Sequence, residues 1–318
     1  MPSDVCLVIF FNHRYEKNIP KLYDIYRMRF DNIKIIIPFF KSSDDQRIIT
    51  VYENSHTFQG FFSQAYSEIQ SAGINHYVFV ADDCLINPQI NQENIVKILH
   101  LDQESGFITK IRLLAPSSLS WSHFRDEDLG FKTQGVEYAG EIPSSQEALR
   151  IIKSHESFSN FSDQTFFDYL AYNELVAKTS KLILKIFNRI FKTNFRNYYR
   201  FVPKVHKRLP FPLLWGYSDF FTVNKDSFNK FVHLCGIFSS MRMFAEIAVP
   251  TSLALSCRKL IEINSTEFNA KAFWGVERNA NLEQLKGETQ GSIQNLFHGE
   301  RGNLLYIHPI KLSTWEVE

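Results

Sequence analysis

The chain has 318 residues, of which 44% are hydrophobic and 22% are charged, a composition that excludes general disorder. Its 35 lysines and arginines nearly balance 34 aspartates and glutamates, which argues against a protein that coats nucleic acid with its whole surface. The 4 cysteines are scattered without a CxxC pair, so a thiolate zinc site or a disulfide scaffold is not expected, and a reducing cytosol is favoured.

Apolar runs in the first 110 residues predict buried strands. Three such runs, at 5–11, 33–40 and 76–81, are typical of strands that are covered on both faces. The stretches between them, 16–30 and 57–72, have apolar residues at helical spacing. Strands that alternate with helices predict a mostly parallel central sheet, with a ligand site beyond the carboxyl ends of its strands.

Glycine-rich loops and membrane segments are not expected. The first glycine is Gly60, so no phosphate-binding loop follows the first strand. This excludes the dinucleotide-binding and P-loop classes and weakens the case for a sugar nucleotidyltransferase. The first apolar run has no basic region before it, as a signal peptide requires, and no stretch approaches 18 apolar residues.

The third predicted strand ends in two adjacent aspartates, Asp82 and Asp83. Neighbouring carboxylates at a sheet edge repel each other unless a cation or hydrogen-bond donors neutralise them. Mg²⁺ or Mn²⁺ prefers carboxylate oxygens and can bridge them to the phosphates of a substrate. The alternative interpretation is a solvated turn, because aspartate is common where a strand ends.

Residues 115–165 are rich in serine, glycine and charge, which predicts loops with short elements. Strand and helix patterns return in the last third of the chain, at 220–223, 226–232, 240–256 and 304–307. The expected fold class is therefore α/β.

A basic helical segment is predicted at 175–208. Its cations recur every three or four residues from Lys178 to Arg200, on one helical face, and 178–208 contains no acidic residue. This pattern fits contact with an anionic membrane surface. The alternatives are a surface helix that buries its apolar face in the core, and RNA binding, which no accompanying RNA-binding motif supports.

These features resemble the nucleotide-sugar-dependent glycosyltransferases of the GT-A fold. The resemblance covers the first 110 residues best: a polar turn follows the first strand, a helix precedes the acidic strand, and that strand ends in a DxD-like motif. It implies that Asp83 binds the metal, Mn²⁺ or Mg²⁺, and that the donor is a nucleotide sugar, expected to be UDP-linked. The chain departs from the family at Ala81, where many members have the first aspartate. The residues that match the family's donor site are Phe11, Asn12, Arg14, Gly60, Gln64 and Asp82.

Two later blocks extend the resemblance. Residues 216–255 look like the family's acceptor half, and Glu246 matches the catalytic base of inverting members. Asp219 competes with it, either as the base or as a contact to donor or acceptor hydroxyls. His308 and Lys311 match late residues that close over the diphosphate or metal, for which His298 and Arg301 are weaker candidates.

The resemblance implies one continuous GT-A-like domain with a basic helical addition, in which residues 1–112 bind the nucleotide sugar and 113–318 bind the acceptor. The implied function is a bacterial-type glycosyltransferase that acts on a glycan or lipid-linked glycan in capsule, O-antigen or lipooligosaccharide synthesis. It is expected in the cytoplasm, at the inner face of the membrane, with no nucleic-acid partner. A non-catalytic sugar-nucleotide- or glycan-binding protein of the same fold is the main alternative, and a nucleotidyltransferase is the second.

Overall fold

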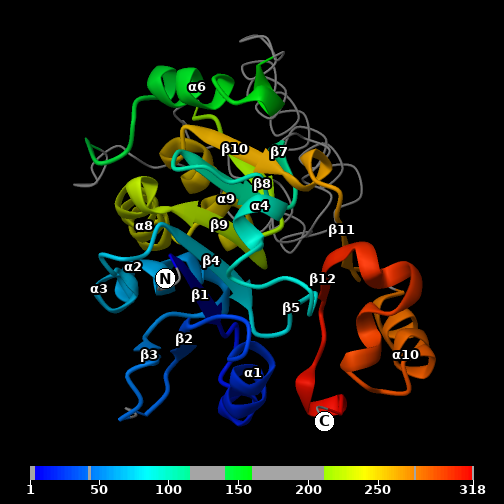
Figure 1. Ribbon diagram of the computed structural model, residues 1–318. Helices are drawn as coiled ribbons and strands as arrows, with labels where there is room; N and C mark the ends of the chain where they lie inside the picture. Colours follow the sequence, from blue (N-terminus) through cyan, green and yellow to red (C-terminus); the bar gives the residue numbers. More distant parts are fainter. Residues whose placement is uncertain (1–3, 42–43, 115–139, 160–210, 276, 317–318) are drawn as a thin grey trace, which may run out of the picture.

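The centre of the molecule is a seven-stranded sheet. The structure, a computed structural model, describes residues 4–41, 44–114, 140–159, 211–275 and 277–316. The strands of this sheet span Val5–Phe10 (β1), Asn32–Pro38 (β2), Ile48–Val51 (β3), His76–Ala81 (β4), Ser105–Ile108 (β6), Phe220–Asn224 (β9) and Lys259–Glu262 (β10). Their order across the sheet is β10-β6-β9-β4-β1-β2-β3 (Figure 1).

The sheet is mostly parallel, as the sequence predicts. Neighbouring strands run parallel except at β9, which is antiparallel to both β4 and β6. Through β9 and β10, the last third of the chain contributes strands to the same sheet as β1 and β4. Because β9 is reversed, its beginning lies beside the carboxyl end of β4.

An aromatic cluster joins two of the helices to one face of this sheet. The helices span Ile19–Tyr26 (α1), Gln59–Gln64 (α2), Tyr66–Ile69 (α3), Ile95–Ile98 (α4), Ser145–Lys153 (α6), Lys225–Ser240 (α8), Ala245–Ser256 (α9) and Arg278–Glu288 (α10). Phe79 of β4 and Phe221 of β9 are cross-strand partners whose rings stack at 4.8 Å. Phe62 of α2 lies 4.8 Å from the ring of Phe79, and Phe231 of α8 lies 5.6 Å from that of Phe221. Such aromatic contacts bury large apolar areas, so α2 and α8 are fixed on this face.

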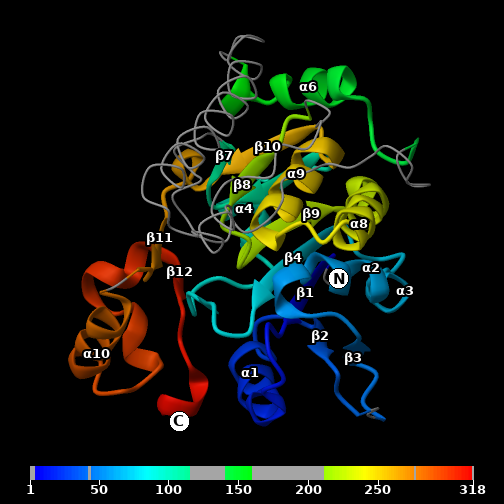
Figure 2. The same cartoon turned by 180° about the vertical axis from the view of Figure 1, so that it is seen from behind.

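A second, three-stranded sheet packs near the opposite face. Its strands are Leu85–Ile86 (β5), Asn269–Ala272 (β11) and Leu304–His308 (β12), in the order β11-β12-β5. The side chain of Phe220 lies on the opposite face of β9 from that of Phe221, because side chains alternate along a strand. Its ring lies 5.5 Å from that of Tyr306 in β12. Figures 1 and 2 show α10 beyond β12, on the side away from the seven-stranded sheet.

Several predicted elements differ in extent. The helix predicted at 57–72 is broken at Ala65 into α2 and α3, and the one predicted at 16–30 forms a 3-10 turn followed by α1. Strand β3 was not predicted; it has only four residues, two of them half-buried. A short antiparallel ribbon of Ile111–Leu113 (β7) and Leu214–Gly216 (β8) completes the strands.

The basic segment at 175–208 lies outside the described residues. Among the helices that the structure describes, none has the length and apolar character needed to cross a bilayer.

Candidate active site

The acidic pair lies at the carboxyl end of β4. Asp82 is only 5% exposed, and its Oδ1 accepts a hydrogen bond of 3.3 Å from the backbone N–H of Asn12, directly after β1. Burial, reinforced by the charge of Asp83, raises the pKa of Asp82 to about 8. Asp82 is therefore mostly protonated at neutral pH, and its carboxyl can donate a hydrogen bond as well as accept one.

Three segments that are far apart in the sequence converge on this edge. His308 ends β12, and its Nε2 lies 3.2 Å from Oδ1 of Asp83 and 3.6 Å from Oδ1 of Asp219. Asp219 immediately precedes β9, and its carbonyl oxygen accepts a 2.8 Å hydrogen bond from the N–H of Ala81. The reversed direction of β9 thus places Asp219 beside the acidic pair.

The two aspartates favour the protonated form of the His308 imidazole. Burial lowers the pKa of His308, but the charges of Asp219 and Asp83 outweigh burial, so the net pKa is raised above its ordinary value. Burial also raises the pKa of Asp219, against the opposing effect of His308. Positive charge at the position of His308, from a proton or a cation, would therefore reduce the repulsion between the two aspartates.

Glu246 lies in the first turn of α9 and is only 8% exposed. Burial, followed by the nearby charge of Asp219, raises the pKa of Glu246 well above its ordinary value. Its Oε2 is buried and has no hydrogen-bond partner. A buried acceptor without a donor is costly, so a hydroxyl donated by a ligand would complete this site.

The loop after Asp83 is held by two side chains that the sequence analysis did not single out. Arg29 donates from Nη1 to the carbonyl oxygens of Ile86, Asn87 and Ile90, at 3.4, 2.7 and 3.2 Å. The hydroxyl of Tyr26 accepts a 3.2 Å hydrogen bond from the N–H of Ile86. Because both side chains belong to α1 or its end, the first helix braces the metal-binding candidate.

The donor side of the predicted site is divided. Phe11 is fully buried, and its N–H continues the pairing of β1 by donating to Ile36 at 2.9 Å. Arg14 is about half exposed and pairs only weakly with Glu16, at 3.5 Å. Arg14 is thus available to an anionic ligand, whereas Phe11 belongs to the buried hydrophobic core.

Two further donor-site candidates have packing contacts. A Cβ at Gly60 would lie 2.5 Å from Oγ of Ser239, so glycine permits the close approach of α2 to α8. The side-chain oxygen of Gln64 accepts a 2.8 Å hydrogen bond from the N–H of Tyr52. These contacts give both residues structural roles in the ligand-free protein.

The remaining candidates lie towards the C-terminus. Lys311 is exposed, three residues after His308. Arg301 pairs with Glu288 of α10 at 2.9 Å, and His298 precedes the 3-10 turn Gly299–Asn303. The described contacts therefore join Asn12, Asp82, Asp83, Asp219 and His308 into one cluster, with Glu246 close enough to interact electrostatically with Asp219.

The cluster fits a divalent cation whose coordination is completed by a substrate. Bonds to a small divalent cation are about 2.1 Å long, so two ligands of one ion lie within about 4.2 Å of each other. Oδ1 of Asp83 and Nε2 of His308, 3.2 Å apart, meet this condition. Within the described residues, no group of three or more His, Cys, Asp or Glu side chains is arranged to hold a metal ion. An ion held by these two side chains would have to take its other ligands from phosphates and water.

The buried acids predict that stability decreases as pH rises. The unfolded chain loses the Asp82 proton near pH 4, whereas the folded protein keeps it until about pH 8, so the free energy of unfolding falls between these values. In Asp82→Asn this contribution is absent, and the amide oxygen can still accept from Asn12. Urea unfolding in EDTA at pH 5 and pH 8 should show a loss of stability that is smaller in the variant by at least about 1 kcal/mol. Equal losses in both proteins would contradict the assigned burial of this carboxyl.

Comparisons with known proteins do not identify the chain. No protein-family model matches it, and no curated protein matches it significantly.

Proposed function

We propose that the protein is a glycosyltransferase that uses a nucleotide-diphosphate sugar, with a UDP-linked donor as the first to test. The observation that carries the proposal is the convergence of Asp83, Asp219 and His308, from three distant segments, at the carboxyl edge of a mostly parallel sheet. Ligands of such sheets bind at this edge. A buried carboxylate without a partner, Glu246, lies near enough to act on a second substrate.

The donor diphosphate is assigned to Asp83 and His308. These two side chains would hold Mn²⁺ or Mg²⁺, which supplies charge neutralisation for the departing nucleotide when it is bound. His308 would bind the cation as a neutral imidazole, so the cation would replace the ring proton that the two aspartates otherwise favour. Asp82 would contact a hydroxyl of the donor, and Arg14, which is about half exposed, would bind an anionic part of the ligand.

Glu246 is assigned the activation of the acceptor. The acceptor hydroxyl fills the empty hydrogen-bonding position at Oε2 of Glu246, which removes its proton as the oxygen attacks the anomeric carbon. The raised pKa brings this carboxyl closer to the pH at which a general base is most effective. Asp219 lies 3.6 Å from His308 and interacts electrostatically with Glu246. It would hold a hydroxyl of the donor or of the acceptor.

Release of free nucleotide from a panel of UDP-, GDP-, CMP- and dTDP-sugars tests the proposal, with Mn²⁺, with Mg²⁺ and with EDTA. Cation-dependent release of a nucleoside diphosphate supports the glycosyltransferase. Thermal stabilisation by a nucleotide sugar without any release indicates a binding protein of similar fold. Pyrophosphate formed from a nucleoside triphosphate and a sugar phosphate indicates a nucleotidyltransferase instead.

The proposal extends to an acceptor presented at an anionic membrane surface by the segment 178–208, as in the synthesis of capsule, O-antigen or lipooligosaccharide. Changing Lys181, Lys185, Arg189 and Lys192 together to glutamine removes charges that are worth about 1 kcal/mol each near such a surface. We expect sedimentation with phosphatidylglycerol vesicles at low salt to weaken by more than tenfold, with activity on short water-soluble acceptors unchanged. Wild-type binding should fall as salt rises. No binding of the wild type at low salt would end the membrane proposal.

A further inference from the structure

Beside the acidic cluster lies an aromatic surface that the catalytic assignments leave unused. The rings of Tyr217 and Trp274 are nearly parallel, with centroids 6.4 Å apart and an angle of 16°. Trp274 is 38% exposed, a large value for tryptophan, and its ring lies 4.9 Å from that of His308. The side chain of Trp274 therefore extends from the diphosphate-binding candidate towards solvent.

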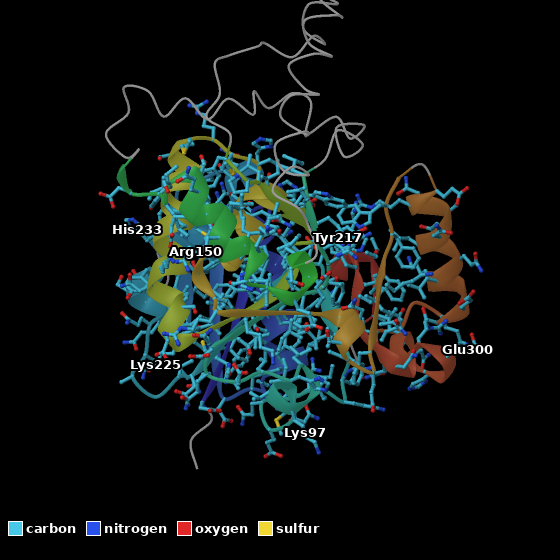
Figure 3. The ribbon with its side chains drawn as sticks, turned by 90° about the horizontal axis from the view of Figure 1, so that it is seen from above. Lys97, Arg150, Tyr217, Lys225, His233 and Glu300 are labelled. Atoms are coloured by element: carbon cyan, nitrogen blue, oxygen red, sulfur yellow. The ribbon has the colours of Figure 1, made fainter. Side chains whose placement is uncertain are left out.

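The backbone and the neighbouring residues fix this surface. Trp274 follows β11, which pairs with the strand that carries His308, and Gly275 then adopts a positive φ of 78° that turns the chain away. Tyr217 precedes Asp219 by two residues. Figure 3 shows Tyr217 between the sheet and the C-terminal part that contains α10. Nζ of Lys110 lies over the Tyr217 ring, 5.9 Å from its centre, and adds a hydrogen-bond donor beside the aromatic pair.

The charges near Tyr217 connect this surface to the acceptor side. The pKa of the Tyr217 hydroxyl is raised by burial and then by the charges of Glu246 and Asp219, and Asp219 follows Tyr217 by two residues in the chain. The orphaned Oε2 of Glu246 requires a donor. A ligand on the aromatic surface that also presents a hydroxyl to Glu246 would satisfy both groups.

We propose that Trp274 and Tyr217 bind the sugar ring of the acceptor that is attacked through its hydroxyl; this inference rests on the proposed function. A sugar has one face of C–H groups, which an aromatic ring covers, and a rim of hydroxyls, which carboxylates and an ammonium group bind. The acceptor is therefore a glycan with an accessible terminal sugar, rather than a phosphate, an amino acid or a lipid headgroup. The sugar would lie against Trp274, with its reacting hydroxyl directed to Glu246.

Steady-state kinetics of the full chain separate acceptor binding from donor chemistry. The acceptors tested are lactose and the methyl glycosides of glucose, galactose, mannose and N-acetylglucosamine. The donor is the nucleotide sugar from which the protein releases nucleotide in the panel. In Trp274→Ala we expect the KM for the acceptor to rise about 10- to 100-fold, as for removal of an aromatic anchor. The KM for the donor and the hydrolysis of donor without acceptor should stay within threefold. Trp274→Phe, which keeps a ring, should retain most of the acceptor affinity.

Met28→Ala is the matched control, because Met28 is an exposed apolar residue on the turn after α1 and should alter neither KM. An unchanged acceptor KM in Trp274→Ala overturns the inference while donor hydrolysis upholds the proposed function. An equal rise in the donor KM also overturns it, because Trp274 would then belong to the donor site.

Tryptophan fluorescence decides the inference independently of turnover. Titration of the wild type with the same glycosides should change the emission saturably, and the change should be lost in Trp274→Phe. If no donor is turned over, the proposed function fails, but saturable quenching that depends on Trp274 still supports glycan binding here. Absence of any quenching by all five sugars overturns it.

Discussion

Replacing Glu246 by glutamine is expected to lower the turnover number about 10²–10⁴-fold, while the affinity for the donor stays nearly unchanged. Glutamine has the size of glutamate but cannot accept the proton of the acceptor hydroxyl. Because burial raises the pKa of Glu246, the folded protein already accommodates a neutral group at this position. The variant should therefore fold at least as stably as the wild type, so that the loss of rate reports on chemistry.

The turnover number should also depend on pH through the ionisation of Glu246. Only the ionised form of Glu246 can act as a base, so the wild-type turnover number should rise with pH along a limb displaced upward from the ordinary value of 4.5. This limb should be absent in Glu246→Gln. Glu104→Gln, at an exposed position, is the control and should keep it. If Asp219→Asn abolishes turnover while Glu246→Gln spares it, Asp219 is the base.

Asp83→Ala is expected to remove the response to divalent cations and to lower turnover at least about 10³-fold, since a cation at a diphosphate supplies several kcal/mol of transition-state stabilisation. The variant retains His308 but loses the carboxylate 3.2 Å from it. Calorimetric titration with a nucleoside diphosphate should show the same affinity with Mn²⁺ as with EDTA, whereas the wild type should bind more tightly with Mn²⁺.

Asp83→Asn is the less severe companion variant, because an amide oxygen still coordinates weakly. Asp102→Asn is the matched control on the surface, where the carboxylate is about half exposed and pairs with Lys259. Near-normal turnover in Asp83→Ala, with retained stimulation by Mn²⁺, would contradict the assignment of the cation to this side chain.

The parts of the fold that follow from the sequence are those with a strong local signal. The run at 76–81 is apolar at every position after His76, and the structure has a fully buried strand there, His76–Ala81. Strand β3 gave a weaker signal. It has only four residues, which alternate between half-buried and buried, so its sequence cannot be distinguished from that of a loop. The break at Ala65 has no proline or glycine to mark it.

The residues of the candidate site could be named from the sequence, but their arrangement in space could not. Asp83 stood out because it follows an apolar run, and Asp219 and His308 were found through the resemblance. Their approach to within 3.6 Å depends on the reversed direction of β9 and on β12 crossing to pair with β5, which are long-range pairings without a local pattern. Trp274 was missed because a single aromatic after a short polar strand carries no periodic signal.

The position of β9 has a consequence for synthesis on the ribosome. Strands β4 and β6 are made within the first 108 residues, but the strand that joins them ends only at Asn224. Until that residue leaves the exit tunnel, one edge of β4 and both edges of β6, whose other neighbour β10 is made later still, have unpaired N–H and C=O groups, a state prone to intermolecular pairing. The loop closed by this insertion is long, so its entropy must be lost before the pairing is gained. Chaperone capture of the emerging chain would protect it during this interval, and the candidate site is assembled among the last parts of the fold.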